Sequence, residues 1–488
     1  MEKYNIALIG SFDVENYGDL LFENIFSFQI QKVVDIENID FFAPKKCKKP
    51  FENDKQIYSV TELEELHIAK PYDAIIVGGG DLIHFHKIMT NMPHISNELV
   101  EYEALYMWLA PLFTAVKYNI PLIWNAPGVP FEFNDRESMC VKAILDVVDY
   151  ICVRDEESRQ ILLSTGTSKN ISVCIDTVLS IRDVFQKDTL KKFLKSTLLP
   201  IEDDEDYIVF HGNVNYSEED IKVCSDILLN IKNTYNKKIV LLPIGYALGD
   251  LEILEKISNH HPNEFIFSKE HFTIFQTISL ISNAAAYIGS SLHGLITATS
   301  YEIPSIVINN YNAVKIKGFL DKIERDNIMI TDVVNLWDKY IEIKEMDFEL
   351  EKRHLDEISS HFKNISGYIK KSTNNKKVMP FGIALMDMMS EMNQMGLKEN
   401  HIHNLEKQNE HLTELFKQLT DDCEIYKKAI EDKENHINNI TNDYKNKIDK
   451  LNNKIDMQND EILMYKDICN TRFGKFAYKL YMKRKGEK

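Results

Sequence analysis

Short apolar runs alternate with helical patterns over the first two-thirds of the chain, and the runs form two series. They are short and rich in β-branched residues, as buried strands of parallel sheets are. The first series is Ile6–Ile9, Ile39–Phe42, Ala74–Val77, Leu122–Trp124, Tyr150–Val153 and Ile171–Ile175. The second is Tyr207–Phe210, Ile239–Pro243, Glu264–Phe267, Ala286–Ile288, Ser305–Ile308 and Ile328–Ile330. Helical segments between them, such as Leu20–Val33, Tyr102–Tyr118 and Glu156–Ser164, predict α/β domains with helices on both sheet faces.

The two series predict two Rossmann-like domains that face each other. The first is residues 1–182, the second is residues 207–337, and a charged linker, residues 183–206, joins them. Open α/β sheets bind ligands at the carboxyl ends of their strands, so we expect the site between the two domains. Residues 338–395 are predicted to be a helical connector, in which a helix at Asp338–His361 packs back across both lobes.

The pattern changes beyond Asn400, where Gly and Pro are absent until Gly474. Apolar residues at three- and four-residue steps predict a coiled coil over residues 396–470. The two apolar stripes are Ile402, Leu405, Leu412, Leu415 and Leu419, then Ile437, Ile440, Tyr444, Ile448, Leu451, Ile455, Ile462 and Tyr465. We expect the coiled coil to make a homo-oligomer. A single amphipathic helix that packs on its own catalytic domain is the alternative.

Residues 471–488 form a basic tail in which aromatic and cationic residues interleave. The cations are Arg472, Lys475, Lys479, Lys483, Arg484, Lys485 and Lys488. This pattern predicts a short amphipathic helix on an anionic membrane surface, and a solvated basic end is the alternative.

Composition narrows the function classes. The chain of 488 residues has a formal net charge of −18, which argues against nucleic acid as a partner. Its seven cysteines are scattered and never spaced as CxxC, which favours free thiols over disulfides or a zinc site. Neither a signal peptide nor a span of about 20 apolar residues is seen, so we expect a cytoplasmic protein, peripheral at the plasma membrane's inner face if the tail binds lipid.

Two motifs in the first series suit ligand binding. Gly10–Leu20 contains Asn16-Tyr17-Gly18-Asp19, where a polar loop opens a helix and directs N–H groups to the cleft. A well-capped strand–turn–helix unit without a ligand is the alternative. Gly78-Gly79-Gly80-Asp81 follows a buried strand, and its N–H groups suit an anion or a sugar. It is neither a Walker A loop nor the dinucleotide GxGxxG motif.

Two further strand ends carry charged or titratable residues. Arg154 follows the strand Tyr150–Val153, and its forked guanidinium suits phosphate or carboxylate, with a surface ion pair as the alternative. His293 lies in the turn Ser290-Ser291-Leu292-His293-Gly294, and histidine exchanges protons near neutral pH. Because no GxSxG elbow precedes it, this is not a hydrolase triad.

In their order along the chain, these four motifs resemble the polysaccharide pyruvyl transferase family. Asp176 and the segments Tyr311–Lys315 and Gly318-Phe319 resemble further parts of the family pattern. The resemblance implies two facing Rossmann-like domains of the GT-B type. It also implies transfer of a pyruvyl group from phosphoenolpyruvate to two hydroxyls of a cell-surface polysaccharide or its precursor, which gives a cyclic ketal and phosphate.

The resemblance also implies a role for each matched residue. His293 is the predicted general acid or base. The predicted donor-binding residues are Arg154, Lys315, Ser290, Ser291, Gly294 and His211, and the predicted acceptor-binding residues are Asn16, Gly18, Asp19, Gly78, Gly79, Gly80 and Asp81. Neither a cofactor nor a metal is expected, and the predicted partner is a glycan or a lipid-linked saccharide.

One position departs from the family pattern. Many relatives carry Arg two residues before the histidine, where this chain has Ser291, and we expect Lys317 or His211 to replace that cation. Two other functions stay open. One is a nucleotide-sugar glycosyltransferase of the GT-B type, although Pro304–Asn310 lacks the acidic residue that usually holds the ribose. The other is a non-catalytic scaffold of a glycan-assembly complex.

Overall fold

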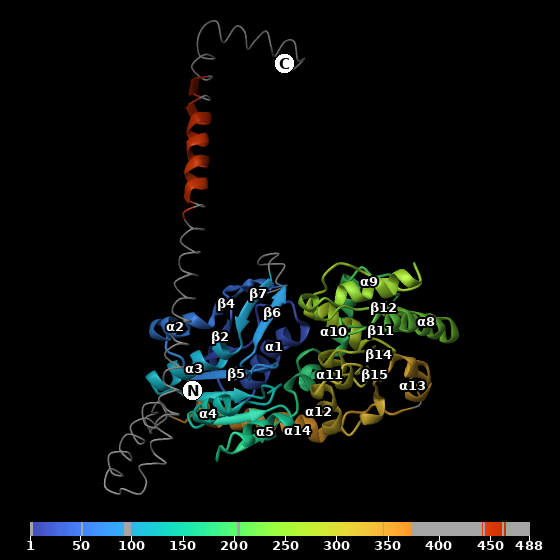
Figure 1. Cartoon of the computed structure of the whole chain (residues 1–488), viewed down its shortest axis with the longest axis horizontal. Helices are drawn as coiled ribbons and strands as arrows, with labels where there is room; N and C mark the ends of the chain where they lie inside the picture. The colour runs from blue at the N-terminus through green and yellow to red at the C-terminus, as the bar shows by residue number, and fades with distance from the viewer. Residues whose placement is uncertain are drawn as a thin grey trace, which may run out of the picture. The chain divides into compact units, whose positions relative to one another are not determined.

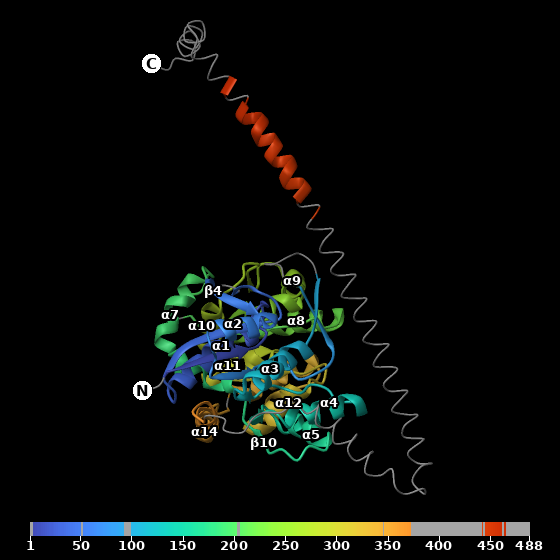
Figure 2. The same cartoon turned by 90° about the vertical axis from the view of Figure 1, so that its left-hand side faces the viewer.

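The computed structural model describes residues 3–49, 52–91, 99–202, 205–344, 346–371, 442, 445–460 and 463–464. The chain divides into two units, Met1–Asp387 and Met388–Lys488. The first unit contains two α/β lobes, which Figure 1 shows side by side, the first mainly blue to teal and the second mainly green to yellow; Figure 2 views the same unit with the first lobe in front.

The first lobe is built on an eight-stranded sheet in the order β10-β9-β8-β5-β1-β2-β4-β3. Its strands are β1 (Tyr4–Ile9), β2 (Ile36–Ala43), β3 (Cys47–Lys49), β4 (Glu52–Ser59), β5 (Ala74–Gly78), β8 (Leu122–Asn125), β9 (Tyr150–Val153) and β10 (Ile171–Val173). All pairs are parallel except β3 with β4. The six predicted strands are therefore confirmed, and the edge pair β3–β4 was not predicted because its residues are polar.

Helices join the strands of the first lobe. They are α1 (Tyr17–Gln31), α2 (Leu63–Ala69), α3 (Leu105–Tyr118), α4 (Asp135–Leu145), α5 (Glu156–Ser164) and α6 (Ile181–Val184). A separate hairpin, β6 (Lys87–Asn91) with β7 (Leu99–Glu103), precedes α3. Part of the predicted helix Tyr102–Tyr118 is therefore strand.

The second lobe has a six-stranded parallel sheet in the order β13-β12-β11-β14-β15-β16. Its strands are β11 (Tyr207–His211), β12 (Lys238–Leu241), β13 (Ile266–Phe267), β14 (Ala286–Gly289), β15 (Ser305–Ile308) and β16 (Met329–Ile330), and its helices are α8 (Glu218–Tyr235), α9 (Asp250–His260), α10 (Ile274–Ser282), α11 (Leu292–Ser300), α12 (Val314–Ile323) and α13 (Leu336–Ile343). The existence of all six predicted strands is confirmed, because each overlaps an observed strand.

Backbone contacts join the two lobes next to the ends of β1 and β12. Asn16 forms an isolated antiparallel bridge with Gly245, and the amide of Tyr17 donates to the carbonyl of Ile244 at 3.1 Å. The amide of Ala247 donates to the carbonyl of Glu15 at 3.3 Å. The loop that enters α1 is thus fixed to the second lobe as well as to its own sheet.

Two connecting segments differ from the prediction. The linker 183–206 contains the helix α7 (Lys187–Ser196), whose Leu190 is buried, and α7 packs against α10. The predicted helix Asp338–His361 is instead two helices, α13 and α14 (Lys352–Ile369). Helix α14 returns to the first lobe and packs against α1 and β8. Amphipathic patterning placed helices there but did not show the break.

In the second unit, residues 445–460 are helical. Ile448, Leu451 and Ile455 are each more than half exposed on this helix. This helix agrees with part of the predicted coiled coil, while its pairing with a second helix stays a prediction. The rest of the predicted coiled coil and the basic tail 471–488 lie outside the described residues.

Candidate active site between the lobes

A cavity of about 400 Å³ lies where the carboxyl ends of the two sheets meet. Its lining includes seven of the predicted site residues: Asn16, Asp19, Gly80, Asp81, Arg154, His293 and Lys315. They follow β1, β5 and β9 in the first lobe and β14 and β15 in the second. The two halves of the sequence therefore contribute to one site, as ligand sites of open α/β sheets do.

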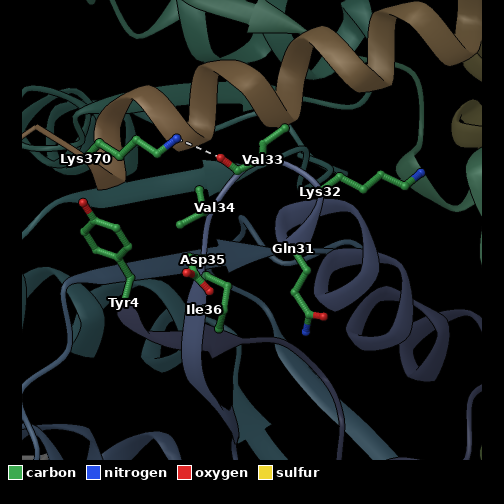
Figure 3. A pocket seen from close by; sticks show the side chains of 8 residues that line it. All are labelled: Tyr4, Gln31, Lys32, Val33, Val34, Asp35, Ile36 and Lys370. Carbon is green, nitrogen blue, oxygen red and sulfur yellow. Dashed lines mark hydrogen bonds between the residues drawn. The ribbon is translucent and has the colours of Figure 1, made fainter. Parts of the chain in front are cut away.

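A larger recess of about 610 Å³ lies elsewhere (Figure 3). It is lined by Tyr4, Gln31, Lys32, Val33, Val34, Asp35, Ile36 and Lys370. Tyr4 and Ile36 begin β1 and β2, so the recess lies at the amino ends of the strands. Lys370 crosses it and donates from Nζ to the carbonyl of Val33 at 2.8 Å. None of the predicted site residues lines this recess, and the opposite edge of the sheet is the usual place for a ligand.

The glycine turn after β5 lets Asp81 lie close to helix α1. Gly79 and Gly80 have φ angles of +89° and +71°, which only glycine adopts without strain. A Cβ atom on Gly80 would lie 2.7 Å from Oδ1 of Asp19, and one on Gly79 would lie 2.4 Å from the Phe22 ring. The turn therefore has no room for side chains.

Helix α1 begins at the cavity with Asn16 as its N-cap. The Asn16 side chain accepts a hydrogen bond from the amide of Gly18 at 3.3 Å and donates through Nδ2 to Oδ2 of Asp19 at 2.9 Å. Gly18 lies directly against the His293 ring, because a Cβ atom there would be 1.9 Å from Nδ1. This first turn thus supports His293 from the opposite lobe.

His293 lies in the first turn of α11, and contacts from both lobes fix its ring. The Phe22 ring meets it edge-on at 5.4 Å between centroids, and Oγ1 of Thr297 donates to its backbone carbonyl at 2.8 Å. Its Nε2 lies 3.7 Å from Oδ2 of the buried Asp176. Neither of these two atoms has a hydrogen-bond partner among the described residues. The imidazole is held in place beside a carboxylate and retains hydrogen-bonding capacity.

The carboxylates near His293 have shifted pKa values. Burial would raise the pKa of Asp176, but the nearby His293 and the charge of Arg154 hold that pKa below its usual value. Burial raises the pKa of Asp19 to about 6, and the cations around it only partly offset that rise. Asp19 is thus a carboxyl that exchanges a proton close to neutral pH.

Two cations from opposite lobes meet at Asp81. The Nη2 group of Arg154 contacts Oδ1, and Nζ of Lys315 donates to Oδ2 at 3.2 Å. Burial would raise the pKa of Asp81, but these two cations keep it well below its usual range. Arg154 also donates through Nε to Asp155 at 3.4 Å. Because Arg154 is buried, its contacts with Asp81 and Asp155 fix the orientation of its guanidinium.

The sequence comparisons identify the family. The family model described as polysaccharide pyruvyl transferase matches residues 16–312. Of the predicted residues in the cavity lining, this range includes all but Lys315. The chain belongs to the polysaccharide pyruvyl transferase family. Among curated proteins, no sequence matches the chain.

Solved structures resemble this pyruvyl transferase family member in fold. The UDP-GlcNAc 2-epimerase of Methanocaldococcus jannaschii is 14% identical with a TM-score of 0.50, over 75% of this chain and 98% of the epimerase. The UDP-GlcNAc 2-epimerase of Neisseria meningitidis is 13% identical with a TM-score of 0.49, over 75% of this chain and 100% of that one. The first likeness agrees with the two-lobed, GT-B-like α/β architecture, and at this identity it concerns the fold alone.

Several predicted donor-binding residues do not line the cavity. Ser291 is the N-cap of α11 and accepts from the amide of Gly294 at 3.2 Å. The hydroxyl of buried Ser290 lies 2.8 Å from that of Tyr216, and Gly294 packs against the ring of Tyr287. These residues shape the turn that presents His293. Gly18, Gly78 and Gly79 likewise act through close packing rather than as lining residues of the cavity.

His211, predicted to replace a missing cation, is also outside the cavity lining. Its Nε2 lies 2.7 Å from Oδ2 of Asp250, and its Nδ1 accepts from the amide of Ser290 at 3.3 Å. Both ring nitrogens therefore contact protein groups, and the donor-binding role of His211 stays a prediction. Lys317, the other proposed substitute, lines a separate recess with Asp155 and Gly318.

Residues that sequence reasoning missed complete the cavity lining: Ser11, Val14, His84, His86, Pro130, Phe131, Ala247 and Leu248. His84 and His86 alternate just after the glycine turn, and alternate residues of an extended segment share a side. The spacing of His84 and His86 could therefore have identified them as candidate site residues from the sequence. Ala247 and Leu248 reach the cavity through packing between the lobes, which no local pattern shows.

Metal sites and membrane-spanning helices were also sought in the described part of the chain. Within them, no group of three or more His, Cys, Asp or Glu side chains is placed to hold a metal ion. None of the helices in the described part of the chain is both long and apolar enough to cross a bilayer.

Proposed function

We propose that this family member transfers a pyruvyl group from phosphoenolpyruvate to two hydroxyls of a sugar, forming a cyclic ketal and releasing phosphate. The observation that carries the proposal is the meeting of His293 with Arg154 and Lys315 in one cavity. A proton-exchanging group beside two cations suits a donor that carries a phosphate and a carboxylate.

The donor binds at the cations of the cavity floor. The guanidinium of Arg154 has five N–H groups, and its contacts with Asp81 and Asp155 use only some of them. The others can bind the donor. Helix α12 begins beside Lys315 without a side-chain cap, so its first N–H groups add to the positive potential. Asp81 holds Arg154 and Lys315 together before the donor arrives, which reduces the cost of ordering them.

The reaction balances without an added oxidant or reductant. A proton adds to the methylene carbon of phosphoenolpyruvate while a sugar hydroxyl bonds to the neighbouring carbon and loses its own proton. The carbon–oxygen bond to phosphate then breaks, and the second hydroxyl closes the ring as its proton leaves. Two hydroxyl protons are released, one equivalent to the proton of the new methyl group and one to the proton on the phosphate.

Two groups of the cavity suit these proton transfers. His293 is the base that accepts a hydroxyl proton, and Asp176 stabilises the imidazolium that forms 3.7 Å away. Asp19, whose pKa is raised to about 6, is the acid that supplies the methylene proton. A pair of groups with separated roles is the arrangement that acid–base catalysis at neutral pH requires.

The partners we propose follow from the same reaction and from the C-terminal helix. The acceptor is a glycan or a lipid-linked saccharide. Two or more copies assemble through the helix around residues 445–460, because Ile448, Leu451 and Ile455 repeat at coiled-coil spacing and are exposed. We further propose that the tail 471–488 holds the assembly at an anionic membrane surface.

The replacement His293→Asn tests the proposal. Phosphate release from phosphoenolpyruvate with an acceptor glycan should fall by about 10²- to 10⁴-fold, as loss of an acid–base group does. His261→Asn is the matched control, because His261 is paired with Asp226 away from the cavity. Wild-type turnover in the His293 variant would reject this assignment. Turnover of a nucleotide sugar in place of phosphoenolpyruvate would reject the proposed donor.

A further inference from the structure

Two exposed apolar side chains from opposite lobes line the active-site cavity. Phe131 of the first lobe is 47% exposed, and Leu248 of the second lobe is 51% exposed. The same cavity is polar elsewhere, with Asp19, Arg154 and Lys315 in its lining. Exposed apolar surface next to a polar site is typical of a ligand-binding surface.

The ring of Phe131 is fixed in position by histidines. His86 meets it at 4.4 Å between centroids and an angle of 70°, and His84 meets it at 5.6 Å and 89°. The amide of His86 donates to Nδ1 of His84 at 3.2 Å. Burial lowers the pKa of His84, and the nearby charge of Asp81 only partly offsets this. Of the two imidazoles, His84 is therefore uncharged at neutral pH.

The backbone beneath Phe131 is tied to the catalytic network. The amide of Gly128 donates to the carbonyl of Gly80 at 2.9 Å, and the amide of Ile83 donates to the carbonyl of Gly128 at 3.2 Å. A Cβ atom on Gly128 would lie 2.6 Å from Oδ1 of Asp81 and 2.8 Å from Cζ of Arg154. The loop that carries Phe131 is thus fixed at Gly128 against the Asp81–Arg154 pair, which favours a preorganised platform.

We propose that Phe131 and Leu248 bind the acceptor as a neutral pyranose, an inference that rests on the proposed function. A pyranose ring has a face of C–H bonds and an edge of hydroxyls. The electron-rich face of an aromatic ring attracts the C–H face, and the hydroxyl edge then meets the polar groups around His293. The two cations of the cavity, Arg154 and Lys315, are already shared between the carboxyl of Asp81 and the phosphate and carboxylate of the proposed donor, and Asp19 adds a further carboxyl. An acidic sugar would add to that repulsion, so the site selects an uncharged one.

The experiment measures sugar binding and turnover separately. Saturation-transfer NMR on the full chain uses methyl hexopyranosides, the matching methyl hexuronides and uridine diphosphate as probes. We expect the neutral glycosides to bind through C–H protons of one ring face, and Phe131→Ala to abolish this while Phe131→Tyr keeps it. In turnover, Phe131→Ala should raise the KM for the acceptor at least ~10-fold and leave the KM for phosphoenolpyruvate unchanged.

Phe113→Ala is the matched control, because Phe113 is also half-exposed but lies on α3 outside the cavity. Wild-type sugar binding by Phe131→Ala would overturn the proposal, as would the absence of any sugar binding by the wild type. Preferential binding of hexuronides would overturn the choice of a neutral sugar. Uridine diphosphate binding that depends on Phe131 would instead make the platform a base-stacking surface. An enzyme that binds neutral sugars through Phe131 but never releases phosphate would reject only the proposed function.

Discussion

Replacing Asp19 by Asn should change stability and activity in opposite directions. Burial raises the pKa of Asp19 from 3.8 to about 6 in the folded chain, despite the cations nearby. A group with a raised folded-state pKa stabilises the fold fully below pH 3.8 and loses that contribution as the pH rises through 6. The ionised carboxylate of Asp19 is therefore a cost to the fold at pH 8.

The magnitude follows from the two pKa values. Each pKa unit corresponds to about 1.4 kcal/mol, so the Asn variant should gain about 2 to 3 kcal/mol on the wild type between pH 4 and pH 8. For a unit of the size of Met1–Asp387 this is a difference in Tm of about 3 °C. Asn keeps an oxygen for the hydrogen bond from Nδ2 of Asn16.

Thermal melts of both proteins across this pH range measure the effect, with Asp146→Asn as a control at an exposed carboxylate. The Tm of the Asp19 variant should exceed that of the wild type by an amount that grows with pH. Turnover of the same variant should fall at least ~100-fold, because the proposed proton donor is gone. A Tm difference that is constant with pH would refute the pKa reasoning, and undiminished turnover would refute the catalytic role.

Two other predictions follow. Arg154→Lys should raise the KM for phosphoenolpyruvate about 10- to 100-fold, because the forked contacts of a buried guanidinium are lost. The control Arg159→Lys, in the exposed pair with Glu156, should leave that KM unchanged. Equal donor affinity in both variants would contradict the proposed donor site. Leu451→Asp should shift the full-length chain to monomer in sedimentation, with Asn453→Asp as the neighbouring control, and an unchanged mass would exclude this helix as the oligomer contact.

The strands and the strand-end motifs were predictable because their signals are local. Buried parallel strands such as β1 and β14 are apolar runs, and Asn16, Asp81 and His293 each lie in the turn after such a run. Strand β4, which lies between β2 and the edge strand β3, begins with polar residues and is not a continuous apolar run, so it was missed. Periodicity therefore predicted the framework better than its edges.

The finer division of roles was not predictable because it depends on contacts between distant segments. Ser291 was expected at the donor, but it caps α11, a use that a serine before a helix often has. His211 meets Asp250 across 39 residues of sequence, and only the fold shows that its ring is already bonded. Phe131 was unremarked because an exposed aromatic residue in a loop has no periodic pattern.

The backbone bridge between Asn16 and Gly245 has a consequence for how this enzyme can diversify. It connects the loop that supports the His293 ring to a loop of the other lobe through main-chain groups, which side-chain replacement does not remove. Exchanging a whole lobe with that of a relative would have to preserve this main-chain pairing. Under the acceptor role proposed for Phe131 and Leu248, single substitutions at these two positions would change the acceptor preference and leave this pairing intact, which recombining lobes would not.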